Sequence, residues 1–230
     1  TGGGIFVTNT ESVSTVNHCL FRNLSAPAAN GWALSGAINF HEADVNIYSS
    51  SFISNRCEDF LNIIRSEFSL HDLEFSGTQS DAFDGDFVKG AIYNSTFIDC
   101  GNDAIDVSGS QLHLENIVVN LPADKAISAG ENSKIWAKNI EIYGGEIGVV
   151  SKDLSAIQIQ NLKIEDTRLG ISSFQKKTEY GVAQVAVDSL TLINNEVDYL
   201  IEIGSQLVID NQVVETVSDD VIEQMYGNEY

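Results

Sequence analysis

The sequence has 230 residues, 43% of them hydrophobic, and its 33 acidic and 12 basic side chains give a net charge of −21. A chain of this length can form one large domain with a sizeable core. The negative charge argues against nucleic acid and anionic membranes as partners, because binding phosphate groups needs clustered Lys and Arg. No apolar run approaches the roughly 20 residues that span a bilayer, so we expect no membrane insertion.

Short segments in which apolar and polar residues alternate recur along most of the chain. Their last residues are separated by 23, 22, 22, 23, 22, 28 and 22 positions: Ile47, Leu70, Ile92, Leu114, Ala137, Ile159, Val187 and Ile209. Two positions after each of them stands Asn, Asp or Ser, and five positions after the first seven stands an apolar residue. Short strands at this period with a recurring polar corner indicate a solenoid whose repeats are single coils. We therefore predict an all-β fold, a single-stranded parallel β-helix of about eight coils with 22–23 residues each.

One earlier coil fits at Val16, and roughly nine extra residues then form a loop at 25–35. We expect the apolar positions to line the interior and the recurring Asn and Ser to form a ladder at an inward corner. The 28-residue repeat inserts about six residues at 174–181 and projects a basic segment from one side. The pattern then decays, so we predict a β-helix over residues 1–212 and, over 213–230, an acidic cap or tail that is a short helix or frayed.

The two ends of the chain differ in this pattern. The sequence begins with Thr1 and three glycines, without an initiator Met, and the first coil has no cap of its own. Since a bare coil edge invites strand addition, we expect further domains or a partner chain at the N-terminal end of the solenoid. The three cysteines lack the spacing of a disulfide framework or a metal site, so we expect buried apolar side chains at Cys19, Cys57 and Cys100.

Residues one period apart in the sequence become neighbours in a solenoid, so a site appears as a row of side chains. Spacings of 22 or 23 residues predict two such rows: Asp81, Asp103 and Lys125 in the first, and Asp84, Asp106, Ser128, Ser151 and Ser173 in the second. Glu58 lies 23 residues before the first row and would extend it. With one further carboxylate, five acids collect beside Lys125, and we call them the acidic stripe: Asp81, Asp84, Asp86, Asp103 and Asp106.

Carboxylates stacked about 5 Å apart raise one another's pKa or recruit a cation. Oxygen ligands without His or Cys favour Ca²⁺, so the five acids of the stripe are candidate metal ligands. A lysine tuned by burial and charge can abstract a proton, which makes Lys125 a candidate catalytic base for β-elimination. Two of the carboxylates could instead hydrolyse a glycoside. In a purely structural interpretation, the acids bond to the backbone at tight corners while Lys125 neutralises them.

Several residues near the stripe are candidates for substrate binding. Arg65 precedes the acids by one coil and could neutralise Asp84 or Asp86 or hold a substrate carboxylate. Lys152 and Lys176 lie a few coils further along the chain. Five aromatic residues could stack on sugar rings or serve as packing residues: Trp32, Trp136, Tyr48, Tyr93 and Tyr143.

Over roughly residues 5–212 the chain resembles the right-handed parallel β-helices of the pectate-lyase superfamily. Its segments 80–90 (SDAFDGDFVKG) and 101–110 (GNDAIDVSGS) also resemble bacterial β-helix repeat domains of poorly characterised function. The resemblance implies right-handed coils, a polysaccharide ligand and an extracellular or cell-surface location, bacterial in origin. Likeness to calcium-dependent lyases implies that Asp81, Asp84, Asp103 and Asp106 hold the cation, with Lys125 as the base.

The motifs of polygalacturonases (Gly-His-Gly and Arg-x-Lys) and of mannuronan epimerases (Asp-Pro-His-Asp) are absent. From the sequence we expect an extracellular or surface β-helix whose acidic stripe binds a cation, Ca²⁺, and polysaccharide. Two alternatives stay open. One is a calcium-dependent polysaccharide lyase with a lysine base, and the other is a structural stalk of a larger protein.

Overall fold

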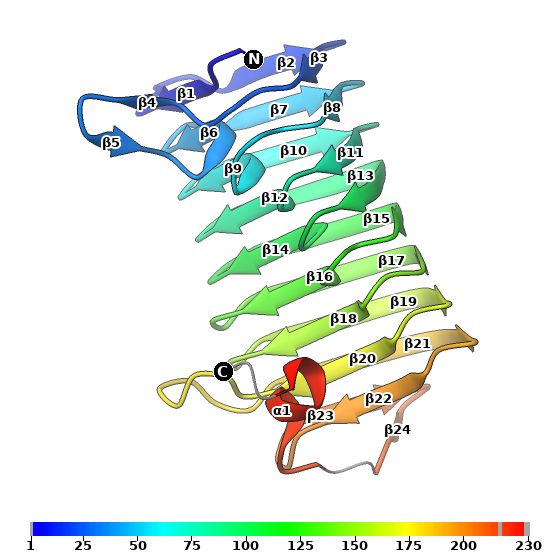
Figure 1. The fold of residues 1–230 in the computed structure, drawn as a ribbon. Helices are drawn as coiled ribbons and strands as arrows, with labels where there is room; N and C mark the ends of the chain where they lie inside the picture. The colour runs from blue at the N-terminus through cyan, green and yellow to red at the C-terminus, as the bar shows by residue number, and fades with distance from the viewer. Residues whose placement is uncertain (1, 216–217, 228–230) are drawn as a thin grey trace.

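The computed structural model describes residues 2–215 and 218–227 and is a parallel β-helix of about eight coils (Figure 1). The chain runs in one direction along a front sheet and returns along a rear sheet one level further down, so the coils wind right-handed (Figure 1). In the described part of the chain, every pairing within the solenoid is parallel except that of the last two strands. The fold class predicted from the repeat is therefore confirmed.

Nine strands, one from each level, form the front sheet. They are β1 (Ile5–Thr8), β6 (Gly36–His41), β9 (Asp59–Ile64), β12 (Asp81–Asp86), β14 (Ile105–Ser108), β16 (Lys125–Gly130), β18 (Ile147–Lys152), β20 (Leu169–Phe174) and β22 (Val197–Ile201).

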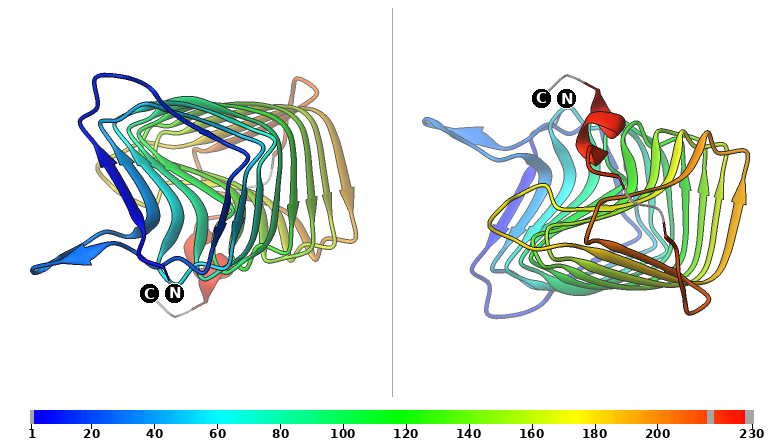
Figure 2. Two further views of the ribbon diagram at one scale, coloured as in Figure 1. Left: turned by 90° about the horizontal axis from the view of Figure 1, so that it is seen from above. Right: turned by 90° about the horizontal axis from the view of Figure 1, so that it is seen from below.

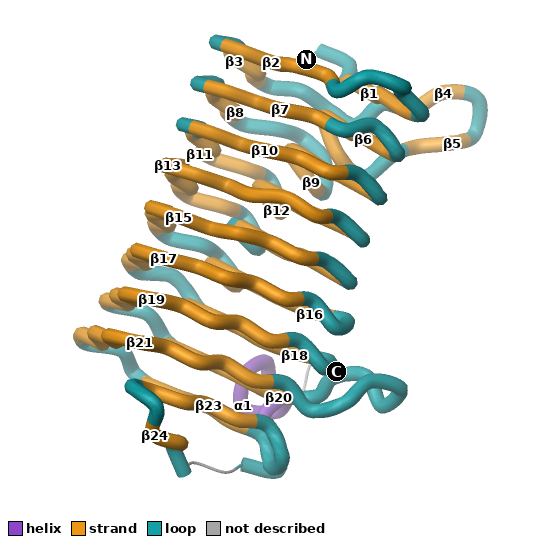
Figure 3. The backbone as a smooth tube through the Cα atoms, turned by 180° about the vertical axis from the view of Figure 1, so that it is seen from behind, coloured by secondary structure: helices purple, strands orange, loops and turns teal. Residues whose placement is uncertain are grey.

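The rear sheet has thirteen strands and bends at a corner into a third face (Figure 3). Its main path is β2 (Ser14–Asn17), β7 (Val45–Tyr48), β10 (Glu67–His71), β13 (Lys89–Cys100), β15 (Gln111–Asn120), β17 (Lys134–Tyr143), β19 (Ala156–Glu165), β21 (Gln184–Ile193), β23 (Gln206–Ile209) and β24 (Gln212–Val213). In the early coils, where the chain breaks at the corner, the third face has separate strands: β3 (Leu20–Arg22), β8 (Ser51–Ile53) and β11 (Glu74–Thr78).

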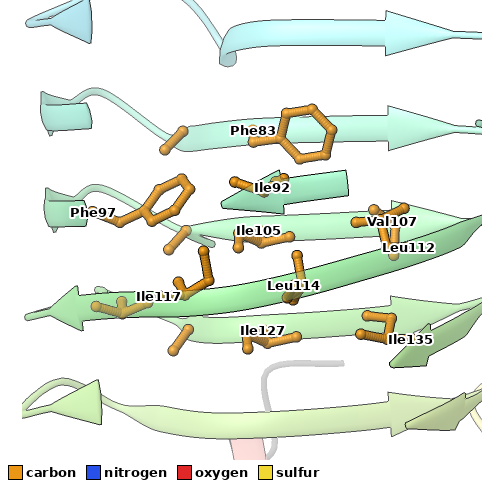
Figure 4. Close-up of a cluster of buried hydrophobic side chains, with 14 of the residues drawn as sticks. Phe83, Ile92, Phe97, Ile105, Val107, Leu112, Leu114, Ile117, Ile127 and Ile135 are labelled. Carbon is orange, nitrogen blue, oxygen red and sulfur yellow. The ribbon is translucent and has the colours of Figure 1, made fainter. Parts of the chain in front are cut away.

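The interior of the solenoid is apolar because alternate residues of both sheets point into it. Phe83 and Ile105 from the front sheet meet Ile92 and Leu114 from the rear sheet (Figure 4). At the third face, the rings of Phe52, Phe75 and Phe97 stack with centroid distances of 4.4 and 5.0 Å. The five-residue offset in the sequence pattern therefore marks core positions, as predicted. Of the three cysteines, Cys100 is buried as expected, whereas Cys19 and Cys57 are partly exposed.

The predicted polar ladder forms at the corner of the rear sheet, but it lies on the outside. Each amide nitrogen donates to the amide oxygen one coil earlier, over 2.8–2.9 Å, through the asparagine ladder Asn94, Asn116, Asn139 and Asn161. These residues have φ between 49° and 63°. A left-handed φ turns the chain so that the strands on both sides keep their apolar side chains inward, and the corner side chain faces solvent. The prediction of an inward ladder was therefore wrong.

Both predicted insertions project from the solenoid (Figure 2). The first carries a short antiparallel hairpin of β4 (Ala28–Ala29) and β5 (Trp32–Ala33). The second is the loop at residues 175–183 between β20 and β21.

The C-terminal segment holds α1 (Val221–Tyr226), which lies outside the stack of coils (Figure 2). Val221 and Met225 pack on the outward side of the front sheet, against the apolar cluster Ile147, Val150, Leu169, Phe174 and Leu200. No helix in the described ranges has the length and apolar character needed to cross a membrane.

Candidate functional site

The outward side of the front sheet carries the predicted acidic stripe. Parallel register aligns Asp59 with Asp81, and Asn62, Asp84, Asp106 and Ser128 with one another in order. In-register residues on neighbouring parallel strands lie about 4.8 Å apart. All five acids of the stripe lie along this outward surface, where Asp84, Asp86 and Asp106 are partly exposed and Asp81 and Asp103 are buried. We call this surface, with the added Asp59, the acidic face: Asp59, Asp81, Asp84, Asp86, Asp103 and Asp106.

The register differs from the prediction at both ends of the rows. The acid aligned with Asp81 is Asp59 and not Glu58, because the strand repeat is 22 residues at this point. Ser128 aligns with Val150, so Ser151 and Ser173 fall one position later, where side chains point into the core, and both are fully buried. A strict spacing of 22 from Lys125 back through Asp103 and Asp81 would have found Asp59.

Asp81 and Asp103 hold the backbone of the next coil. Asp81 Oδ1 accepts hydrogen bonds from Asn102 Nδ2 at 2.7 Å and from the Asp103 amide at 2.9 Å. Asp103 Oδ1 accepts from the Lys125 amide at 2.9 Å and from Lys125 Nζ at 3.3 Å. Both acids are buried. This row therefore has the corner-bonding geometry of the structural interpretation.

Lys125 is a buried ammonium held by carboxylates. Its Nζ contacts Asp124 as well as Asp103, and it lies 5.7 Å from the ring centroid of Tyr226 in α1. Burial alone would lower the pKa of Lys125, but the charges of Asp103 and Asp124 outweigh it, and the pKa is raised. A general base needs a lowered pKa to be free of its proton near neutrality. The geometry therefore disfavours Lys125 as a proton-abstracting base.

The second row contains the most perturbed carboxyl. Asn62 Nδ2 donates to Asp84 Oδ2 and, at 3.3 Å, to Asp59 Oδ2. Burial raises the pKa of Asp84 to about 9, and the nearby carboxyls of Asp59 and Asp86 add to the rise. Burial also raises the pKa of Asp59 to about 7, although a hydrogen bond from Ser35 opposes the shift. Asp84 therefore keeps its proton at neutral pH while remaining partly exposed.

Asp106, the in-register neighbour of Asp84, has a different environment. Its Oδ1 lies 3.9 Å from Lys152 Nζ and accepts no hydrogen bond from the described residues. Lys152 Nζ also donates to Ser128 Oγ at 3.0 Å. The ammonium is thus placed to balance a negative charge on Asp106, next to a carboxyl that is neutral.

The loop at 175–183 runs back along the edge of this face. Asp153 Oδ1 accepts hydrogen bonds from the backbone amides of Lys176 and Lys177 at 2.7 and 2.6 Å, and Lys177 Nζ pairs with Glu131. Burial and the nearby ammonium groups of Lys152 and Lys125 lower the pKa of Lys176. Of the predicted substrate-binding residues, the structure brings Lys152 and Lys176 together.

Arg65, the third predicted substrate-binding residue, lies at the corner between the two sheets. Its guanidinium is 5.4 Å from the ring centroid of Phe87. Burial raises the pKa of Asp86, with help from Asp106, and the charge of Arg65 works against that rise. Arg65 therefore borders the acidic face at Asp86 and does not join the two lysines.

The donor set does not form a ready calcium site. Within residues 2–215 and 218–227, no three Asp, Glu, His or Cys side chains are grouped as a bound metal ion requires. Asp81 and Asp103 direct an oxygen at backbone amides, and Asp84 and Asp59 share the amide of Asn62. The calcium site inferred from the sequence stays a prediction.

No protein-family model matches the chain, and a search of curated proteins by sequence found no match. Among solved structures, the catalytic domain of a GH87 α-1,3-glucanase in complex with nigerose is 13% identical with a TM-score of 0.45, over 98% of this chain. Full-length tailspike protein 2 from the Escherichia coli O157:H7 bacteriophage CAB120 is 9% identical with a TM-score of 0.37, over 90% of this chain. This chain spans only 59% and 42% of those two chains. Similarity at this level carries no inference about substrate or activity.

Proposed function

We propose that the acidic face binds a polysaccharide. The proposal is supported by the carboxyl of Asp84, which is partly exposed. Burial raises the pKa of this carboxyl to about 9. A protonated carboxyl offers one O–H donor and acceptor oxygens, whereas an ionised one only accepts. Sugar hydroxyls also donate and accept, so the neutral, partly exposed carboxyl of Asp84 beside the acceptor of Asp106 suits them.

The layout of the face favours a polymer over a small molecule. Its partly exposed carboxyls, Asp84 and Asp86 on β12 and Asp106 on β14, lie on neighbouring strands about 4.8 Å apart, and a linear glycan presents its hydroxyls repeatedly along its length. The high negative charge of the chain disfavours polyanions, so a neutral polysaccharide is the better ligand. With such a ligand, we also propose that the domain lies outside the cell or on the cell surface.

Binding is tested with immobilised neutral polysaccharides and two substitutions at one position. Asp84→Asn keeps the shape, the donor and the acceptor of a protonated carboxyl, so we expect affinity within about threefold of the wild type. Asp84→Ala removes all of them and is expected to lower affinity at least tenfold, since about 1.4 kcal/mol corresponds to a factor of ten. Glu74→Gln on β11 is the control for an acid-to-amide change at an exposed site outside the acidic face. Equal binding by all four proteins would overturn the proposal and favour the structural stalk.

Glycoside hydrolysis is a second candidate, favoured by the contrast between Asp84 and Asp106. Retaining glycosidases use two carboxyl groups about 5–5.5 Å apart, close to the spacing of in-register residues on neighbouring strands. Asp84 would give its proton to the glycosidic oxygen while the Asp106 carboxylate attacks the anomeric carbon. The bond to the leaving sugar breaks and a glycosyl ester forms. Water would then cleave the ester, with Asp84 taking the proton of that water.

The same Asp84 variants separate hydrolysis from binding. An amide cannot give up a proton to a leaving group, so Asp84→Asn should bind polysaccharide and release no reducing ends. Lys152→Gln, which leaves Asp106 without its balancing charge, should lower the rate less than Asp84→Asn does. Reducing ends released by Asp84→Asn at the wild-type rate would rule out this mechanism and leave the binding proposal untouched.

A further inference from the structure

The outward side of the rear sheet carries a row of stacked aromatic rings. The side chains of Tyr48, His71 and Tyr93 follow one another in register across β7, β10 and β13. Their ring centroids are 5.1 and 4.7 Å apart, and the planes are inclined by only 18° and 21°. This side of the solenoid faces away from the front sheet and its acidic face (Figures 1 and 3).

A second row lies on the next three coils, displaced by two positions toward the start of the strands. His113 on β15 and Trp136 on β17 are in register, with centroids 5.2 Å apart and planes inclined by 18°. Gln158 on β19 follows them. Trp136 is 37% exposed, although a buried position would remove more of its apolar area from water. Part of the indole is therefore available to a ligand, while His113 covers one face of the ring.

The second row forms one side of a groove of about 670 Å³, and its other side is formed by residues two positions later in the same strands: Glu115, Lys138, Gln160 and Asp188. Tyr93, the last ring of the first row, borders the groove at one end, and Asp188 and Asn211 border it at the other. It crosses β13, β15, β17, β19 and β21, so its long axis follows the axis of the solenoid. Five neighbouring strands extend over about 20 Å. The groove therefore suits an extended polymer better than a compact ligand.

The polar groups of the groove are mixed and partly neutralised. Lys138 Nζ lies 3.9 Å from Glu115 Oε1, and the amides of Gln158 and Gln160 supply both donors and acceptors. Asp188 adds a negative charge at one end. On a chain with a net charge of −21, this set repels an acidic polymer and offers hydrogen bonds to uncharged hydroxyls.

We propose that this groove, lined by Trp136, His113, Gln158 and Gln160, is a second polysaccharide-binding site, specific for a neutral glycan. Trp136 contacts a sugar ring, and the two glutamines hydrogen-bond its hydroxyls. The site shares no residue with the acidic face and does not depend on the function proposed there.

The sequence has two tryptophans, which makes the groove directly observable. In a Trp32→Phe background, Trp136 is the sole source of indole fluorescence. We would titrate this protein with dextran, laminarin, xyloglucan and galactomannan, and with polygalacturonate as the acidic comparison. We expect at least one neutral glycan to shift the Trp136 emission with saturation, and polygalacturonate to leave it unchanged.

Variants then locate the binding, which affinity electrophoresis in the same glycan measures. Trp136→Ala should weaken it at least tenfold, and Gln158→Ala by a smaller factor. Trp32→Ala is the matched control, because Trp32 is 47% exposed on the β4–β5 hairpin, and it should bind like the wild type. Asp84→Ala should leave the fluorescence response unchanged, which separates this site from the acidic face. Equal thermal stability of the variants excludes unfolding as the cause.

Three results would overturn the proposal. They are an emission that no neutral glycan in the panel alters, a stronger response to polygalacturonate, and wild-type affinity in Trp136→Ala. If Asp84→Ala rather than Trp136→Ala abolished binding, the acidic face alone would bind the polymer.

Discussion

The asparagine ladder and the acidic face are both built by stacking a side chain of one coil on that of the next, about 4.8 Å apart. At the ladder, each Nδ2 donates to the Oδ1 of the preceding coil, as from Asn116 to Asn94 over 2.8 Å. On the acidic face, neighbouring carboxylates have only acceptors to offer one another. An amide column is therefore complete in itself, whereas a carboxyl column needs protons, backbone amides, a lysine or a ligand.

The largest expected effect comes from removing the lysine that serves the carboxyl column. The side chains of Lys125 and Asp103 are 8% and 3% exposed, so Lys125→Ala leaves a buried acid without its cation. Breaking a buried pair in this way costs about 3–5 kcal/mol. Urea unfolding at pH 7 measures the loss. The double variant Lys125→Met with Asp103→Asn should recover most of it, and a loss below about 1 kcal/mol in Lys125→Ala would show that the pair contributes little.

The second effect is a fall in stability as the pH rises. Folding raises the pKa of Asp84 from 3.8 to about 9 and that of Asp59 to about 7, so between these limits the folded state holds protons that the unfolded state has lost. Stability therefore decreases with pH, by up to about 1.4 kcal/mol per pH unit for each titrating group. We expect the midpoint of urea unfolding to be higher at pH 5 than at pH 8.

Asp84→Asn is the control for that pH dependence, because an amide mimics the protonated acid and does not titrate. It should flatten the slope and stabilise the protein at pH 8. A slope that is unchanged in Asp84→Asn would assign the titration to other carboxyls.

The smallest effect is expected at the asparagine ladder. Asn116→Ala removes two exposed hydrogen bonds. It also places an alanine, which disfavours the left-handed region, at a φ of 56°. Together the two changes cost about 1–2 kcal/mol. Asn116→Gly loses the same hydrogen bonds but tolerates the left-handed backbone. Thermal unfolding of both variants separates the two contributions, and equal losses would show that backbone strain plays no part.

The sequence period predicts much of this arrangement and fails where one residue decides an orientation. A spacing of 22 brings Asp84 next to Asp106 and Asp103 next to Lys125, as the register confirms. An offset of a single residue, however, reverses which side of a strand is exposed. For that reason Ser151 was predicted on the surface and lies in the core.

Other features depend on contacts between residues far apart in the sequence. The pairing of Lys177 with Glu131 joins residues 46 positions apart, and it depends on the path of an irregular loop. The protonation of Asp84 and the charge of Lys125 follow from burial and from neighbours on several coils. A period identifies which residues are neighbours, and it does not give their exposure to water.

Helix α1 breaks the equivalence of the coils. On a uniform solenoid, a bound polymer could shift by one repeat and meet almost the same groups again. Helix α1 covers apolar positions on β18, β20 and β22, and its Tyr226 ring lies near Lys125. The front sheet therefore has a polar surface on one side of that lysine, and on the other side α1 covers it. If a glycan binds the acidic face as we propose, it would have a fixed end point at α1, and each of its sugar units would occupy a distinct subsite.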